Sequence, residues 1–150
     1  MKKIPVEKGT VGITINLLKR LNGHFQHGRS TKIGIALYSN KTQYDNIFQG
    51  FEVHLIRKQK ETTRIYKNAD GKEVKITYSE SEIIANSKEF GAYAWSFPNL
   101  SDVYHDFPQF QNHHDEIVSR LHEITFKSAF SRQPIEQTQT LNGLIQARCQ

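Results

Sequence analysis

Hydrophobic and polar side chains alternate most regularly near the middle of the chain. Over residues 73–79 they follow the two-residue period of a strand with one buried face. The preceding segment Asn68–Gly71 reads Asn-Ala-Asp-Gly, which is typical of a turn because Asn and Asp bond their own backbone and Gly adopts a positive φ. We therefore predict a β-hairpin whose strands cover 61–67 and 73–79.

Burial of one face should set the register of this hairpin. With Asn68–Gly71 as the loop, Ile65 faces Val74. Two residues further along each strand, Thr63 faces Ile76. A slip by one residue would turn these hydrophobic side chains toward water, so we expect the first register. It places four residues on the exposed face: Arg64, Tyr66, Glu73 and Lys75.

The rest of the chain predicts shorter elements. Residues 11–21 combine β-branched side chains with hydrophobic positions at helical spacing, and Asn22-Gly23 is a good helix end, so we predict a short helix there. A polar lead-in over 1–9 precedes it. The other expected elements are a loop over 23–31, strands over 32–39, 51–58 and 92–97, a short helix over 81–88 and irregular structure over 99–110.

The clearest helix is predicted over residues 113–130. Its hydrophobic positions repeat at helical spacing, and Asn112 is a residue type that caps helix N-termini. The face that should pack on a sheet carries five residues: Ile117, Val118, Leu121, Ile124 and Thr125.

The order of these elements indicates an α+β fold, because the strands cluster in the middle and the helices lie outside them. A chain of 150 residues fits one domain. We expect that domain over 1–130, with an antiparallel sheet of about four or five strands, a basic central hairpin and the 113–130 helix packed against the sheet. The Gln-rich segment 131–150 is expected to be a docked arm or a mobile tail.

Positive charge is concentrated around the predicted hairpin. Seven Lys or Arg and three acidic residues lie between Arg57 and Lys75, in a chain whose net charge is +5. Such a surface can meet phosphates or an acidic protein, and a tyrosine among cations can stack on nucleic-acid bases. The predicted contact residues are Arg57, Lys58, Lys60, Arg64, Tyr66, Lys67, Lys72 and Lys75.

The segment Gly23–Ser30 (GHFQHGRS) nearly matches a phosphate-binding P-loop. That motif requires G-x-x-x-x-G-K-[ST] between a strand and a helix. Here Arg29 replaces the lysine, and a strand is expected to follow. Nucleotide hydrolysis is therefore not expected, whereas Arg29 and Lys32 are candidate anion contacts in what is otherwise an ordinary polar turn.

The composition restricts the kinds of site and the location. Because Cys149 is the single cysteine, a disulfide framework and a cysteine-based zinc site are excluded, and a reducing cytoplasm is the expected compartment. No apolar run approaches the ~20 residues of a membrane span, so we expect no membrane partner. No cofactor or metal site is predicted, since the histidine spacings match no metal-binding arrangement.

We interpret the chain as a small non-catalytic binding protein that engages nucleic acid or another acidic macromolecule through the hairpin. The alternative is a small phosphodiesterase or ribonuclease, which needs an acid, a base and a cation to hold the phosphate. Its candidate residues are the E-x-K strand at Glu73 and Lys75 and the histidines His105, His113, His114 and His122.

A third interpretation is a protein–protein adaptor or inhibitor that uses the aromatic stretch 90–110. Such a cluster is more often part of a core, with Trp95 buried and its N–H bonded. If several of these side chains were exposed, an interface would be favoured.

Overall fold

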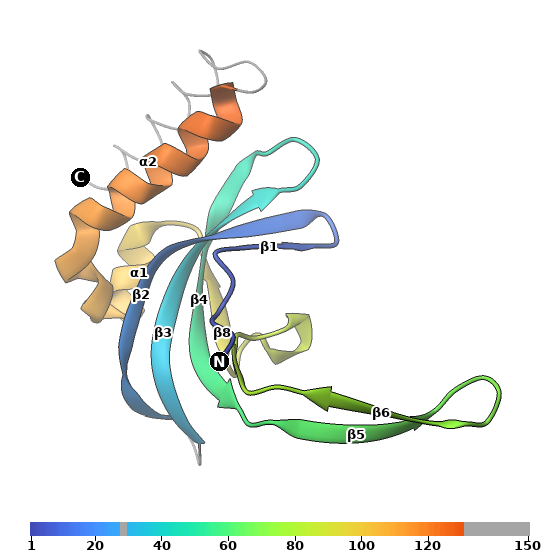
Figure 1. The fold of residues 1–150 in the computed structure, drawn as a ribbon. Helices are drawn as coiled ribbons and strands as arrows, with labels where there is room; N and C mark the ends of the chain where they lie inside the picture. The colour runs from blue at the N-terminus through green and yellow to red at the C-terminus, as the bar shows by residue number, and fades with distance from the viewer. Residues whose placement is uncertain (28–29, 131–150) are drawn as a thin grey trace.

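The computed structural model describes residues 1–27 and 30–130. Its main element is an antiparallel sheet built on three long strands: β2 (Ile13–His27), β3 (Ser30–Thr42) and β4 (Phe48–Gln59). β1 (Glu7–Thr10) pairs with β2, whereas β7 (Ser81–Ile83) and β8 (Ala94–Phe97) pair with different parts of β4 (Figure 1).

Helices cover one face of this sheet (Figure 1). They are α1 (Leu100–Asp106), the 3-10 helix η2 (Pro108–His113) and α2 (His114–Phe130). Ile117 and Leu121 of α2 join Leu37 and Val53 of the sheet in one buried cluster. The predicted α+β class is therefore confirmed, with the C-terminal helix packed on an antiparallel sheet.

The opposite face of the sheet carries a second buried cluster, which explains the sequence of β3. Ala36 and Tyr38 belong to this cluster, while Ile35 and Leu37 belong to the one beneath the helices. A strand with both faces buried reads as a nearly continuous apolar run. The segment 32–39 has that character, and the strand predicted there is present within β3.

The predicted hairpin strands are present, but they form a separate two-stranded sheet. β5 (Thr62–Lys67) pairs with β6 (Glu73–Tyr78), and Figure 1 shows the pair extending away from the rest of the fold. We call residues 60–80 the arm. All residues of the two strands are exposed except the half-buried Thr62, so the arm contributes little to either buried cluster.

The predicted register of the arm is wrong by one residue. Ile65 lies opposite Lys75 instead of Val74. The loop is longer than expected, because the backbone N–H of Asn68 donates to the carbonyl of Lys72 at 2.9 Å. The prediction assumed that one face is buried. Since neither face is, burial does not select the register, and the turn geometry does.

The predicted helix over 11–21 is wrong, because most of this segment belongs to β2. That part of β2 pairs with β1 on one side and β3 on the other, so two ladders hold it extended. The β-branched side chains suit this environment better than a helix. The loop expected over 23–31 is also wrong, since β2 runs to His27 and β3 begins at Ser30. The lead-in over 1–9 includes most of β1.

Two predictions in the second half of the chain are also wrong. The helix expected over 81–88 is replaced by β7 and a 3-10 helix (Ser87–Glu89), because the end of β4 offers β7 a pairing partner. The irregular segment 99–110 contains α1, whose N-cap is Asn99. Asn112 is not the N-cap of α2, because it lies inside η2, and α2 follows η2 directly at His114.

The aromatic stretch 90–110 packs mostly into the cluster beneath the helices, as predicted. Phe110 is fully buried, and Phe107 packs against the same cluster. Trp95 is half-buried rather than buried, with its ring centre 5.6 Å from that of Phe107. These side chains support the fold. Among the described residues, no helix is long and apolar enough to cross a membrane.

Candidate functional site

One face of the arm carries a row of exposed hydrophobic and aromatic side chains. The cross-strand pairs place Tyr66 beside Val74 and Arg64 beside Ile76, with Tyr78 at the base. The exposed fractions of Tyr66, Val74, Ile76 and Tyr78 lie between 39% and 43%. Large apolar side chains that remain this open on a projecting element are typical of a binding surface.

Tyr66, Tyr78 and Arg64 interact with one another on this face. The two tyrosine hydroxyls are 3.5 Å apart. The hydrogen bond from Tyr78 and then the one from Arg64 lower the pKa of Tyr66, while the contact with Tyr66 raises the pKa of Tyr78. The arrangement therefore combines two aromatic rings and a guanidinium on one exposed surface.

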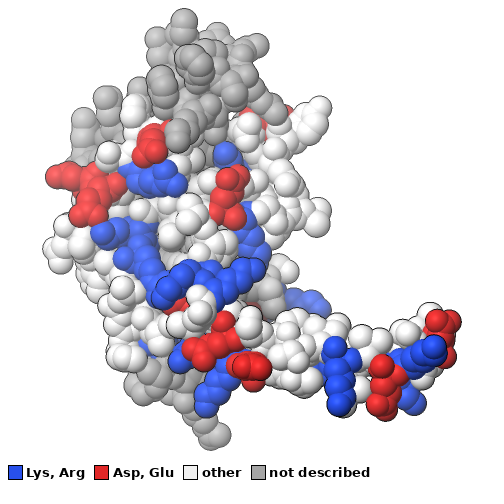
Figure 2. All heavy atoms as spheres, in the orientation of Figure 1, with Lys and Arg blue, Asp and Glu red and all other residues white. Residues whose placement is uncertain are grey.

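The other face of the arm is more polar. Ile65 lies opposite Lys75 and Lys67 opposite Glu73. Nearer the base of the arm, the hydroxyls of Thr63 and Thr77 are 3.0 Å apart. The prediction that Glu73 and Lys75 share a face with Arg64 and Tyr66 is therefore wrong, because the observed register turns these two residues to the opposite face. Figure 2 shows that cations and acids lie next to one another toward the tip of the arm.

Two of the predicted contact cations are held in ion pairs where the arm joins the sheet. Arg57 binds both carboxylate oxygens of Glu89, at 2.7 and 2.9 Å, and its guanidinium lies 4.1 Å from the centre of the Tyr93 ring. Lys58 pairs with Glu80 at 2.9 Å. Arg57 therefore has a structural role, whereas the Lys58 pair is exposed and contributes little to stability. Both cations are already paired with a carboxylate, which makes them less suited to contact an outside phosphate.

The remaining predicted cations fall into three groups. Lys60 and Lys72 are exposed on the arm. Lys32 is fully buried beside the Tyr93 ring, and burial, followed by the nearby Arg57, lowers the pKa of its ammonium. Arg29 lies outside the described residues, as does the segment 131–150.

The histidines and the E-x-K strand do not converge on one site. The Nδ1 atom of His114 is 2.7 Å from the hydroxyl of Tyr104, whereas His105 contacts its neighbour Asp106 in solvent. The E-x-K strand lies on the exposed arm. No group of three or more His, Cys, Asp or Glu in the described part of the chain could hold a metal ion.

Sequence reasoning missed a buried polar network on β3 and β4. Nε2 of His54 is 2.9 Å from one oxygen of Glu52, and the side-chain amide of Asn40 donates to the other oxygen. His54 is 1% exposed and Glu52 6%. The signal was present in β4, where Glu52 and His54 alternate with the hydrophobic residues of the helix side.

This network lies at the floor of a cleft of about 520 Å³. The β1–β2 turn and the segment that follows β7 form its sides. The lining includes Lys8, Ile15 and Phe90 together with the three polar residues of the network. The volume is in the range of small-molecule sites in proteins.

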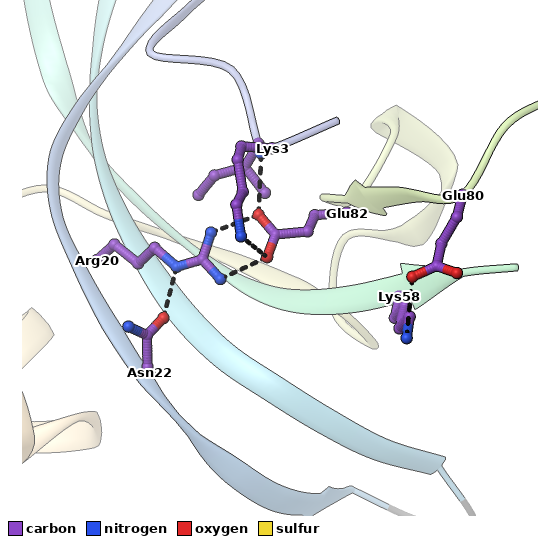
Figure 3. Close-up of polar contacts among 7 residues, drawn as sticks. Lys3, Arg20, Asn22, Lys58, Glu80 and Glu82 are labelled. Atoms are coloured by element: carbon purple, nitrogen blue, oxygen red, sulfur yellow. Dashed lines mark hydrogen bonds and ion pairs between the residues drawn. The ribbon is translucent and has the colours of Figure 1, made fainter. Parts of the chain in front are cut away.

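A second polar cluster fixes β7 and the start of the chain to the sheet. Figure 3 shows Arg20 of β2 and the Lys3 ammonium directed at the carboxylate of Glu82. The backbone N–H of Ile4 also donates to this carboxylate, at 3.2 Å. All its partners belong to the chain itself, so we interpret the cluster as structural.

Comparisons with protein-family models, curated proteins and solved structures found no match for this chain.

Proposed function

We propose that the protein binds double-stranded DNA through the arm and does so without catalysis. The observation that supports this function best is the arm itself, a two-stranded ribbon whose two faces are exposed. An isolated hairpin is only marginally stable in water, so a projecting one that retains its large side chains is better explained by a partner. The major groove of DNA admits a two-stranded ribbon.

The charges of the arm support contact with the DNA backbone. Five cations lie on it: Lys60, Arg64, Lys67, Lys72 and Lys75. The cross-strand pairs place Arg64 on one face and Lys67 and Lys75 on the other, so that one face can enter the groove while the long lysine side chains of the other reach the bordering phosphates. The acidic residues among them reduce the attraction, so we expect binding that depends on a few phosphate contacts and weakens clearly with salt.

The Arg64–Tyr66–Tyr78 face supports contact with base edges. A guanidinium can bond the O6 and N7 atoms of guanine, and apolar side chains such as Val74 and Ile76 can contact the methyl group of thymine. The opposite face, with Lys67 and Lys75, would then lie toward phosphates. Substitutions on the Arg64 face should therefore change sequence preference, whereas substitutions of Lys67 and Lys75 should change overall affinity.

The test measures binding of labelled duplex DNA, single-stranded DNA and RNA by fluorescence anisotropy between about 50 and 200 mM salt. Wild type is compared with Lys67→Gln/Lys75→Gln. The matched control is Lys2→Gln/Lys88→Gln, which removes the same charge from exposed positions outside the arm. Parallel samples with Mg²⁺ or EDTA report any cleavage, and so test the phosphodiesterase alternative.

We expect the duplex to bind most tightly and its salt slope to fall by about two in the arm variant, because each lost phosphate contact removes about 0.9 from that slope. The control variant should retain the wild-type slope. Equal losses in both variants would mean that net charge alone drives binding. If no nucleic acid binds at low salt, the proposed function is wrong, and the exposed apolar face of the arm would favour a protein partner instead.

The proposal includes a cytoplasmic location, which suits a chain with a single cysteine.

A further inference from the structure

The cleft above Glu52 has the composition of a ligand site, although the proposed DNA contact does not use it. It lies on the sheet face opposite the helices, and its floor consists of Asn40, Glu52 and His54. The side chains of Glu52 and His54 are 8% and 1% exposed. Polar residues buried this deeply under an open cleft need an explanation beyond folding.

Most of the free hydrogen-bonding capacity of this floor consists of acceptors. The carboxylate of Glu52 can only accept hydrogen bonds, so both Nε2 of His54 and the amide nitrogen of Asn40 must donate to it. With its donor used in this way, a neutral His54 presents Nδ1 as an acceptor, and Asn40 presents its Oδ1. Beside these acceptors, the floor has one further donor, the second N–H of the Asn40 amide.

Two of these acceptors are unpaired within the described part of the chain. Nδ1 of His54 and Oδ1 of Asn40 are both buried and have no hydrogen-bond partner there. A buried acceptor without a partner is destabilising. Both atoms have almost no exposed surface, so a ligand donor bonds them only where the side chains around them shift. Among the described residues, the ion-pairing partner of the Glu52 carboxylate is His54, and no lysine or arginine contacts it.

The walls add an apolar surface and an aromatic ring. Ile13, Ile15 and Ala85 line the cleft together with Phe90. The Phe90 ring is 38% exposed, and its centre is 5.5 Å from that of the His54 imidazole. A cation above the floor would lie close to this ring, and aromatic faces attract cations.

We propose that this cleft binds a primary ammonium group carried on a small apolar body. An ammonium supplies three donors and a positive charge, which match the unpaired acceptors and the Glu52 carboxylate. The apolar body lies against the isoleucines and Phe90. Lys8 lines the cleft as well, and its charge opposes an incoming ammonium, which makes it a second means of testing the proposal.

The experiment uses the full chain and three probes that share one body: benzylamine, benzyl alcohol and benzoate. Amide and His54 ring resonances are followed by NMR as each probe is added. We expect benzylamine to shift the signals of the cleft residues, with benzyl alcohol binding at least about tenfold more weakly because it lacks the charge-assisted bonds. Benzoate should not bind.

Variants show whether the cleft is responsible. Glu52→Gln keeps the shape but removes the charge, and should weaken benzylamine binding about tenfold. Glu61→Gln, on the exposed arm, is the matched control and should bind as wild type does. Lys8→Ala should bind benzylamine more tightly. If Glu52→Gln fails to fold, Ser96→Phe replaces it, because Ser96 is exposed and lines the cleft, and should block binding.

The source of the ammonium is tested with N-acetyl-lysine methylamide, which presents the same group from a peptide. If it binds at least as well as benzylamine, the cleft accepts lysine side chains of a polypeptide; if benzylamine binds better, it accepts a free amine. Both results support the proposal. Absence of cleft shifts with either amine would overturn it, as would equal binding of benzoate or unchanged binding in Glu52→Gln. None of these results depends on DNA binding.

Discussion

Arg20 and Glu82 form a two-point ion pair that joins β2 to β7 across 62 residues of sequence. The Nη2 atom of Arg20 is 2.6 Å from one carboxylate oxygen of Glu82, and Nη1 binds the other (Figure 3). The hydrogen bonds from Arg20 are the largest cause of a pKa for Glu82 of about 2. Because the carboxylate of Glu82 also accepts a hydrogen bond from the backbone N–H of Ile4, the pair holds together β2, β7 and the start of the chain.

This pair should make the stability of the fold depend on pH in the acid range. The pKa of Glu82 is lowered in the folded chain, so its stabilisation is present above the ordinary glutamate pKa of about 4.3. It is lost as the pH falls from there through about 2. The size is about 3 kcal/mol, because each unit of pKa corresponds to about 1.4 kcal/mol.

Glu82→Gln should therefore lower the free energy of unfolding by about 3 kcal/mol at neutral pH, with the difference from wild type shrinking toward pH 2. Urea unfolding at a series of pH values measures this. Glu61→Gln is the control, because Glu61 is exposed on the arm and should have little effect. A Glu82→Gln chain that keeps the wild-type pH dependence would contradict the prediction.

The cluster beneath the helices should dominate the stability of the protein. Phe110→Ala should lower the free energy of unfolding by about 3–5 kcal/mol, because Phe110 is fully buried and its removal leaves a cavity. Ile65→Ala removes a hydrophobic side chain that is 57% exposed on the arm, and should change stability by less than about 0.5 kcal/mol. Chemical unfolding measures both, and similar losses would mean that the arm is packed in solution.

Sequence patterns predicted correctly those elements whose hydrophobic spacing or turn residues match the packing that the structure shows. The 113–130 helix has one apolar face and lies on a sheet, so α2 begins one residue after the predicted start and ends at the predicted end. The hairpin turn at Asn68–Gly71 was predicted from its turn residues, and the strand at 92–97 from its strand-like sequence. The α+β class followed from the order of these elements along the chain.

The wrong predictions depended on partners that are distant in sequence. Residues 11–21 carry helical spacing, yet the ladders with β1 and β3 make them a strand. The register at Ile65 could not be predicted, because it was argued from a buried face that the arm does not have. The cleft was missed because Glu52 and Asn40 lie on different strands, and only their register brings them together.

Gly34 should be required for the close approach of β3 to β2. A Cβ atom at this position would lie 2.7 Å from the carbonyl oxygen of Leu21 and 3.1 Å from Cδ1 of Ile56. Because backbone cannot move as freely as a side chain, Gly34→Ala should destabilise the fold by about 1–3 kcal/mol. In Gly9→Ala the new atom meets only the end of the Gln43 side chain, at 3.1 Å.

Thermal unfolding of the two glycine variants measures this difference. Gly9→Ala should lie within about 0.5 kcal/mol of wild type, since the glutamine amide can shift. Equal stability of both variants would show that β2 and β3 can separate locally without cost.

The arm should be removable without loss of the fold. Gln59 pairs with Ser81 at the point where the arm leaves the sheet, so replacing residues 60–80 with Asn-Gly closes β4 and β7 with a two-residue hairpin turn. The arm strands contribute no residue to either buried cluster, and the lost Lys58–Glu80 pair is exposed. The free energy of unfolding should therefore change by less than about 1 kcal/mol. Thermal and urea unfolding measure it, and the amide spectrum reports whether the signals of the remaining sheet are preserved.

A chain that fails to fold would show that the arm organises the sheet. A folded chain whose DNA affinity is unchanged would instead place the DNA contact elsewhere, while the amine test of the cleft would be unaffected.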